Sequence, residues 1–290
     1  MKIAILGTGK MGGAMARRLA SCGFDMTVWN RTTARAAELH IGIVAATPVE
    51  AARNADIVIS SLTNDAAVRD VYLGEHGALE APEHRLFIDT STAGPEIIDE
   101  LGREADKRKA RLLSAPVVGS VPAVEAGKLL ILAGGDRADL EQALPVLRNL
   151  GDVHYVGERG SAQRLKLIAN SMLGITSAAA AELLTAGTAM RLDPEQVFSI
   201  LVRFAPGLAA RERGFLHRQH TPTMFAVRDL VKDLDLGVQA FDGNGAPTPL
   251  TRQARDLYEE AMRGSADLDI SAVIEQSRHI DADQIGHEIT

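Results

Sequence analysis

Short apolar runs alternate with longer amphipathic segments along the first half of the chain. The segments between the runs are rich in Ala, Arg and Glu, and their apolar residues recur at helical spacing. Strands that alternate with helices are typical of a mostly parallel sheet covered by helices on both faces. The runs that we expect to form the strands are Ile3–Leu6, Met26–Trp29, Ile57–Ser60, Leu86–Ile88, Leu112–Leu113, Leu129–Leu132 and Val153–Val156.

The pattern changes near Gly160. A long helical stretch without a strong breaker runs from Ser161 to Met190, and no convincing strand follows it. We therefore predict an α/β domain over residues 1–160 and an all-helical domain over residues 161–290, with the last ten residues or so weakly ordered. The further helical segments are Glu195–Phe204, Pro206–His217, Val227–Phe241, Pro249–Met262 and Ile270–His279.

A glycine-rich turn follows the first expected strand. Gly7-Thr8-Gly9-Lys10-Met11-Gly12 spells G-x-G-x-x-G and opens the helical segment Met11–Ser21. The glycines suit a tight turn, a close approach to a pyrophosphate and close helix–strand packing, and the helix N-terminus attracts the anion. We therefore predict that the first domain is a doubly wound Rossmann sheet. Its residues 7–12, which include Thr8, Lys10 and Met11, are predicted to bind a dinucleotide. A glycine-rich turn without a ligand is the alternative.

The residues after the second strand distinguish between the two nicotinamide cofactors. Enzymes that use NAD place Asp or Glu about 20 residues after the glycine loop to hold the ribose 2′-hydroxyl. This chain has Asn30-Arg31-Thr32 there, and no acidic residue. A guanidinium fork and a hydroxyl suit a 2′-phosphate, so we predict that NADP(H) is favoured over NAD(H). The alternative is a solvated arginine at the start of a helix.

Further motifs, in matching order, resemble the β-hydroxyacid dehydrogenase family, which includes 3-hydroxyisobutyrate dehydrogenase and the glyoxylate/succinic semialdehyde reductases. The resemblance covers nearly the whole chain and implies a Rossmann domain, a long connecting helix and an all-helical domain, with the active site between the domains. The segments that carry it, beside the glycine loop and Val28–Thr32, are Asp89–Thr92, Ala115–Ser120 with Glu125–Gly127, Gly157–Gly160 with Lys166 and Asn170, Lys232–Leu234, and Asp267–Ile274, which is most similar to the semialdehyde reductase branch.

The resemblance assigns the reaction to the helical stretch. It implies that Lys166 donates a proton to the developing alkoxide of a small carbonyl substrate, because hydride transfer to a carbonyl must be completed by a proton. Asn170, one helical turn later, would share its face. Lys232 would reach the nicotinamide and the substrate, and Asp233 would be structural. The family also implies a homodimer or homotetramer.

Two residues at the carboxyl ends of strands complete the implied cofactor site. Thr92 follows the Leu86–Ile88 strand, where open α/β sheets bind ligands, and it would contact the substrate or the nicotinamide ribose. A helix cap before Pro95 is the alternative for Thr92. Leu62, after the Ile57–Ser60 strand, would lie over the adenosine and pyrophosphate side.

The substrate loop departs from the family at Val118. Relatives have a serine there, whose hydroxyl helps to hold the substrate carboxylate. Valine donates no hydrogen bond, and one bond to a charged group contributes roughly 1.5–3 kcal/mol. Gly119 and Ser120 keep their backbone donors. The loop is therefore compatible with a semialdehyde or 2-oxoacid, or with a bulkier and less charged carbonyl.

Two further functions compete with the carbonyl reductase. Imine reductases share the V-W-N-R-T strand end, but they generally lack the lysine that this chain has as Lys166. A non-catalytic dinucleotide-binding protein would be favoured only if Lys166 had been lost. We therefore expect an oxidoreductase that interconverts a small carbonyl compound and its hydroxy acid.

Composition narrows the partners. A formal net charge of −7 argues against binding to nucleic acid, and the sequence offers no uninterrupted apolar segment of membrane-spanning length. The single cysteine, Cys22, excludes an intrachain disulfide; we expect it to be buried and the protein to be cytoplasmic. The eight histidines lack metal-ligand spacing, so no metal site is expected.

Overall fold

The computed structural model describes residues 1–278, and the chain divides into two compact units. The first unit is Met1–Lys166 and the second begins at Leu167. They meet within helix α8 (Arg159–Ala189), whose first turn contains the boundary that we predict at residues 160/161. The expected weak order of the C-terminal residues concerns positions outside the described part of the chain.

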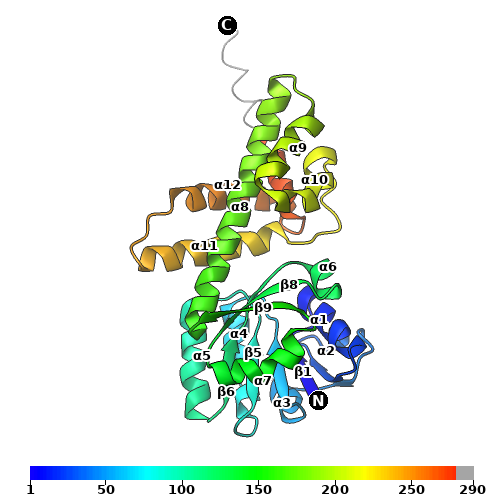
Figure 1. The fold of residues 1–290 in the computed structure, drawn as a ribbon, viewed down its shortest axis with the longest axis vertical. Helices are drawn as coiled ribbons and strands as arrows, with labels where there is room; N and C mark the ends of the chain where they lie inside the picture. Colours follow the sequence, from blue (N-terminus) through cyan, green and yellow to red (C-terminus); the bar gives the residue numbers. More distant parts are fainter. Residues whose placement is uncertain (279–290) are drawn as a thin grey trace. The chain divides into compact units, whose positions relative to one another are not determined.

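The first unit is built on a nine-stranded sheet (Figure 1). Its order is β3-β2-β1-β4-β5-β6-β8-β7, and β9 pairs with β8. Strand pairs are parallel except β6–β8 and β7–β8, so the doubly wound Rossmann-type sheet is confirmed. The strands are β1 (Lys2–Leu6), β2 (Asp25–Trp29), β3 (Ile43–Val44), β4 (Ile57–Ser60), β5 (Leu86–Asp89), β6 (Arg111–Ser114), β7 (Val117–Val118), β8 (Leu129–Gly134) and β9 (Gly151–Gly157).

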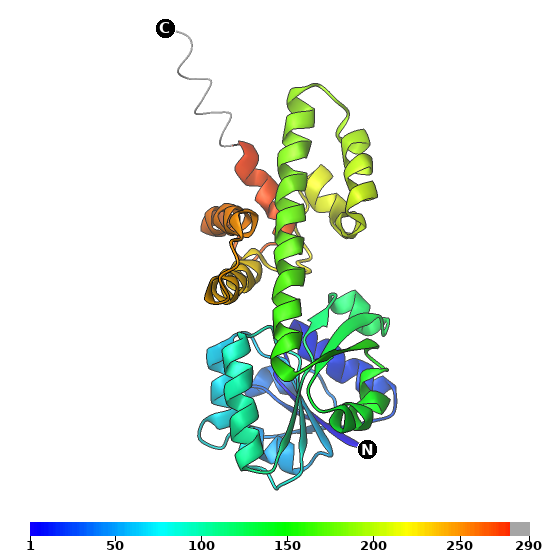
Figure 2. The ribbon, with the colours of Figure 1, turned by 60° about the vertical axis from the view of Figure 1, so that its left-hand side comes forward.

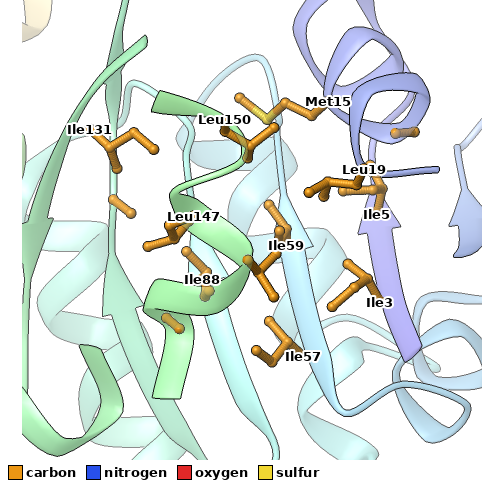
Figure 3. Packing of buried hydrophobic residues seen from close by; sticks show 14 of the residues in the cluster. Ile3, Ile5, Met15, Leu19, Ile57, Ile59, Ile88, Ile131, Leu147 and Leu150 are labelled. Carbon is orange, nitrogen blue, oxygen red and sulfur yellow. The ribbon is translucent and has the colours of Figure 1, made fainter. Parts of the chain in front are cut away.

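Helices cover both faces of this sheet because its central strands are apolar on both sides. In β1, Ile3 and Ile5 pack with Met15 and Leu147 on one face (Figure 3), whereas Leu6 belongs to the core of the other. The helices of this unit before α8 are α1 (Lys10–Ser21), α2 (Thr33–Ala37), α3 (Pro48–Arg53), α4 (Asp65–Leu73), the 3₁₀ turn η1 (Ala78–Glu80), α5 (Pro95–Lys107), α6 (Val121–Glu125) and α7 (Arg137–Leu147).

Among its described residues, the second unit consists of helices and connecting loops, with one isolated bridge between Ala226 and Asp269. Leu184 of α8 packs with Phe198, Leu230, Tyr258 and Ile274 in one buried cluster. Helices α11 and α12 lie side by side (Figure 2). The elements after α8 are α9 (Pro194–Phe204), the 3₁₀ helix η2 (Pro206–Arg211), α10 (Glu212–His217), α11 (Val227–Gly243), α12 (Pro249–Ser265) and the 3₁₀ helix η3 (Ile270–Arg278).

Cys22 corrects one expectation about the core. It follows the last turn of α1 at the C-cap position, and its side chain is exposed rather than buried. The apolar face of α1 uses Ala16 and Leu19 instead.

Helix α8 is long and apolar enough to cross a membrane by length and composition alone. Half of its most apolar window is buried inside the protein. Core helices of water-soluble proteins meet the same criterion, so this feature is weak evidence for a membrane span.

Candidate cofactor and active-site residues

The glycine loop has the backbone that a phosphate cradle requires. Gly7 adopts φ +95°, and a Cβ built on it would lie 2.4 Å from the Ser61 carbonyl oxygen. A Cβ on Gly12 would lie 1.9 Å from the Gly7 carbonyl oxygen. Side chains are therefore excluded at both positions, while Gly9 faces open space at the start of α1. The chain's residues fit a pyrophosphate bound on the helix N-terminus.

Asn30 links this loop to the turn after β2. Its Oδ1 accepts a hydrogen bond from the Thr8 backbone N–H (3.1 Å), and its Nδ2 donates to the Thr32 carbonyl (3.0 Å). Arg31 and Thr32 are exposed in that turn, with no acidic residue beside them. The Asn30 side chain thus connects the glycine loop to the turn whose residues we predict to hold the ribose 2′-phosphate.

Lys10 and Met11 form the first turn of α1. The Lys10 side chain is exposed and that of Met11 is half-buried against the core. Gly13, in the next position of the turn after Gly12, donates its N–H to the Gly9 carbonyl (2.8 Å). Lys10 and Met11 would therefore contact a cofactor as part of the N-terminus of α1.

A buried carboxylate joins the ends of β4 and β5. Asp89 Oδ1 accepts hydrogen bonds from Ser60 Oγ (2.6 Å) and Ser91 Oγ (2.7 Å), and Ser91 Oγ accepts the Leu62 backbone N–H (2.9 Å). Burial raises the pKa of Asp89 to about 6, although both serine hydrogen bonds oppose that shift. Thr92 is half-buried in the loop that follows. Leu62 and Thr92 thus lie at the edge of the sheet where such folds bind ligands.

The predicted substrate loop is part of the antiparallel end of the sheet. Val118 is the last residue of β7, pairs with Leu130 of β8 and is half-buried. Gly119 follows with φ +136°, and a Cβ there would lie 2.8 Å from Leu129. Ser120 is the N-cap residue of α6, yet its side chain makes no capping hydrogen bond. The valine is therefore followed by the two residues that we expect to contribute backbone donors.

Gln163 was not recognised from the sequence. Its side chain is fully buried; Nε2 donates to the Ser91 carbonyl (3.0 Å), and Oε1 accepts the Ala93 N–H (3.3 Å). Gln163 therefore fixes the first turns of α8 to the loop after β5. Lys166, three residues later, is 8% exposed. A glutamine one turn before the predicted proton donor was the available signal.

Asp233 brings two predicted site residues together within the second unit. Its Oδ2 accepts a hydrogen bond from Asn170 Nδ2 (2.5 Å), and its Oδ1 forms an ion pair with Lys232 Nζ (2.6 Å). Asp233 is 2% exposed and Asn170 is 3% exposed. The structural role that we expect for Asp233 thus takes the form of a shared carboxylate between the late K-D-L segment and α8.

A serine, a histidine and a glutamate also form a hydrogen-bonded chain that the sequence did not reveal. His220 Nδ1 lies 2.9 Å from Ser271 Oγ, and His220 Nε2 lies 3.3 Å from Glu275 Oε1. Ser271 is only 1% exposed, and a Cβ on Gly214 would lie 2.0 Å from its hydroxyl. Because this hydroxyl is tightly packed, we interpret the three hydrogen-bonded side chains as a structural contact and not as a nucleophilic site. Among residues 1–278, no group of three potential metal ligands occurs.

Comparison with known sequence families divides the chain in a similar way. Residues 2–157 match the NAD binding domain of 6-phosphogluconate dehydrogenase, and residues 160–277 match the NAD-binding domain of NADP-dependent 3-hydroxyisobutyrate dehydrogenase. Glyoxylate/succinic semialdehyde reductase 1 of Arabidopsis thaliana is 31% identical over 283 residues, which cover 95% of this chain and 98% of that protein. The chain belongs to the β-hydroxyacid dehydrogenase family.

Solved structures of similar enzymes share this fold over nearly the whole chain. The 3-hydroxyisobutyrate dehydrogenase of Mycobacterium tuberculosis, solved with L-serine, has a TM-score of 0.81 at 28% identity and covers 96% of this chain and 99% of its own. A reductive aminase of Aspergillus terreus, in complex with NADPH4, cyclohexanone and allyl amine, has a TM-score of 0.60 at 26% identity and covers 95% of this chain and 98% of its own. As a β-hydroxyacid dehydrogenase, the protein is an NAD(P)-dependent oxidoreductase with a small-molecule substrate.

Proposed function

We propose that the protein is an NADPH-dependent reductase that interconverts a small semialdehyde or 2-oxoacid and the corresponding hydroxy acid. The glycine loop supports the dinucleotide, because its backbone leaves no room for side chains at Gly7 and Gly12. The exposed Arg31 and Thr32, with no acidic residue beside them, support a 2′-phosphate. The name of the Arabidopsis relative supports the substrate class.

The proposed chemistry needs one proton donor from this chain. A bound reduced nicotinamide would supply the hydride for the carbonyl carbon. Lys166 Nζ, as an ammonium, stabilises the oxygen on which negative charge develops and gives it a proton. Asn170, held by Asp233, presents an amide one helical turn from Lys166. Gly119 and Ser120 offer backbone N–H groups for the substrate carboxylate, and Lys232 offers a positive charge.

A substrate panel with both cofactors tests this function. We expect glyoxylate, succinic semialdehyde or tartronate semialdehyde to oxidise NADPH faster than an uncharged aldehyde or a cyclic imine does. We also expect NADPH to bind more tightly than NADH, because only the former gains charge-assisted hydrogen bonds from Arg31. The measurements are absorbance at the reduced nicotinamide band and cofactor titration. Tighter binding of NADH would contradict the assignment of Arg31, and turnover of the imine alone would contradict carbonyl reduction.

Val118 favours a second candidate, reduction of a bulkier or less charged carbonyl or of an imine. The valine removes a hydroxyl that the family uses for the substrate carboxylate, and the reductive aminase shares the fold at 26% identity. The presence of Lys166 argues against imine reduction, since imine reductases generally lack a lysine at this position. The two candidates differ in whether the substrate carries a carboxylate.

Replacing Val118 with serine separates these candidates. We expect kcat/KM for small carboxylate substrates to rise about tenfold or more, because a hydroxyl donor to a charged group contributes roughly 1.5–3 kcal/mol. Val118→Ala is the matched control, since it removes the same two methyl groups without adding a donor. An equal gain in both variants would show that volume alone matters, and no change in either would place residue 118 away from the carboxylate.

The outer face of α8 supports a homo-oligomer. Ile168, Met172 and Leu183 of α8, and Met190 directly after its last residue, recur at intervals of whole helical turns and are 54%, 61%, 47% and 67% exposed. Large apolar side chains gathered on one face mark an interaction surface. We propose that a second copy of the chain covers this face in a homodimer or homotetramer, which sedimentation velocity would detect as a mass at least twice that of the chain.

A further inference from the structure

The buried carboxylate of Asp89 is only half used by the protein around it. Both serine hydroxyls, Ser60 and Ser91, donate to the same oxygen, Oδ1. The other oxygen, Oδ2, is buried and has no hydrogen-bond partner among residues 1–278. A carboxylate in this position loses its hydration without gaining a full set of donors, which is unfavourable for the charged form.

The unfavourable burial of the charged carboxylate is reflected in the pKa of Asp89. Burial, with a smaller contribution from the nearby acid Asp65 of α4, raises the pKa of Asp89 from 3.8 to about 6. Tyr72 of α4 faces the same site and is kept neutral, because burial and Asp89 both raise the pKa of its phenol. An acid with a raised pKa in the folded state destabilises the fold as pH rises from about 4 to about 6, where the unfolded chain is ionised more readily. Residues that cost stability are concentrated at functional sites.

Two series of contacts begin at the Asp89 carboxylate, and we call them the first and the second arm. In the first, Ser91 donates its only hydroxyl proton to Asp89, so the Ser91 oxygen is oriented to accept the Leu62 N–H (2.9 Å). Leu62 is in turn close to the glycine loop, because a Cβ on Gly7 would lie 3.0 Å from Leu62 Cδ2. In the second arm, Ser60 Oγ lies 2.8 Å from the hydroxyl of the fully buried Tyr72. The first arm ends at the phosphate cradle and the second ends in the core.

We propose that Asp89 is a positioning residue for the dinucleotide, which acts by orienting Ser91 so that Ser91 holds the Leu62 loop against the glycine loop. This inference rests on the dinucleotide-binding part of the proposed function and not on the 2′-phosphate. Asp89 itself is buried and does not touch the cofactor. The arm through Ser60 and Tyr72 stabilises the fold without setting cofactor affinity.

The pair Ser91→Ala and Ser60→Ala tests the proposal. Both substitutions remove a buried hydroxyl that donates to the same Asp89 oxygen, so each should lower the melting temperature. Only Ser91→Ala removes the acceptor of the Leu62 N–H. We expect Ser91→Ala to raise the Kd of NADPH at least tenfold and Ser60→Ala to change it less than threefold, as measured by titration calorimetry on the full chain.

A fragment of the cofactor separates positioning from general damage. Adenosine 2′-monophosphate keeps the groups that face the turn after β2 but lacks the pyrophosphate that the glycine loop would hold, so Ser91→Ala should raise its Kd by a smaller factor than that of NADPH. If the wild-type protein prefers NADH, NADH and adenosine replace the two ligands. Equal losses of NADPH affinity in both serine variants would overturn the proposal, as would an equal loss for the fragment. A wild-type protein that binds neither dinucleotide would instead refute the proposed function, and this inference with it.

Asp89→Asn supplies a readout that a purely structural role would not produce. The amide keeps an acceptor for both serines but removes the buried charge. At pH 8 we expect the variant to melt several degrees higher than the wild type, with the difference shrinking as pH falls from 6 to 4. We also expect its NADPH Kd to rise about threefold to tenfold, because hydrogen bonds to a charged acceptor are roughly twice as strong as neutral ones. Higher stability with unchanged NADPH affinity would overturn the proposal.

Discussion

Replacing Lys166 with alanine is expected to lower kcat for carbonyl reduction by about 10²–10⁴-fold, the usual contribution of a positioned proton donor. The Kd of NADPH should change less than about threefold, because the glycine loop, Asn30 and Arg31 are untouched. The reason that we propose is that Lys166, which lies on α8 and is only 8% exposed, gives the developing alkoxide its proton. Single-turnover oxidation of bound NADPH measures the chemical step directly.

Arg164→Ala is the matched control for this experiment. It removes a positive charge from the same helix two residues earlier, where the side chain points to a different face and is exposed. We expect this variant to keep its kcat within about twofold of the wild type. A Lys166→Ala enzyme that reduces its best substrate as fast as the Arg164→Ala enzyme would show that the proton comes from another group.

The sheet was largely predictable because its strands are buried on both faces. Runs such as Ile3–Leu6 and Leu86–Ile88 are apolar throughout, and each lies in an observed strand. The two-residue strands β3 and β7 were not predicted, for two different reasons. Ile43 and Val44 of β3 are 60% and 37% exposed at the sheet edge, and Val117–Val118 of β7 follows a proline as part of a loop motif. A pattern of burial cannot identify strands that short.

The candidate cofactor residues could be proposed from the sequence because they are local in it. The glycine loop and the turn at Asn30–Thr32 each consist of consecutive residues, so a local pattern is enough to predict a role for them. The supporting contacts were not readable, because they join distant positions: Asp89 with Ser60, Gln163 with Ser91, and Asn170 with Asp233. Nothing in the sequence shows which buried polar residues share a partner until the chain is folded.

The segment Asp267–Ile274 shows how a motif can carry structure instead of chemistry. It resembles the semialdehyde reductase branch, yet its central residue, Asp269, is 3% exposed and serves the surrounding backbone. Asp269 Oδ2 accepts the Met224 and Phe225 N–H groups, and Oδ1 accepts the N–H of Ser271. The motif thus fixes the segment before α11 and the start of η3 at once.

Asp269→Ala is therefore expected to be one of the most destabilising substitutions in the helical unit. Besides its three backbone donors, Asp269 pairs with Arg211 Nε at 3.0 Å, and the Arg211 side chain is only 10% exposed. Removing one partner of a buried ion pair leaves the other charge uncompensated and costs about 3–5 kcal/mol. We expect the melting temperature to fall by roughly 10 °C, as measured by calorimetry.

Asp267→Ala provides the comparison two residues away. Asp267 pairs with Arg228 at the surface, where the two side chains are 75% and 57% exposed, so its loss should cost no more than about 1 kcal/mol. The Thr223 hydroxyl bonds to the Asp267 backbone carbonyl and would be retained. Equal stability losses in the two variants would refute the distinction, because exposure is what separates them: water replaces the lost partner of Arg228 but cannot reach Arg211 to the same extent.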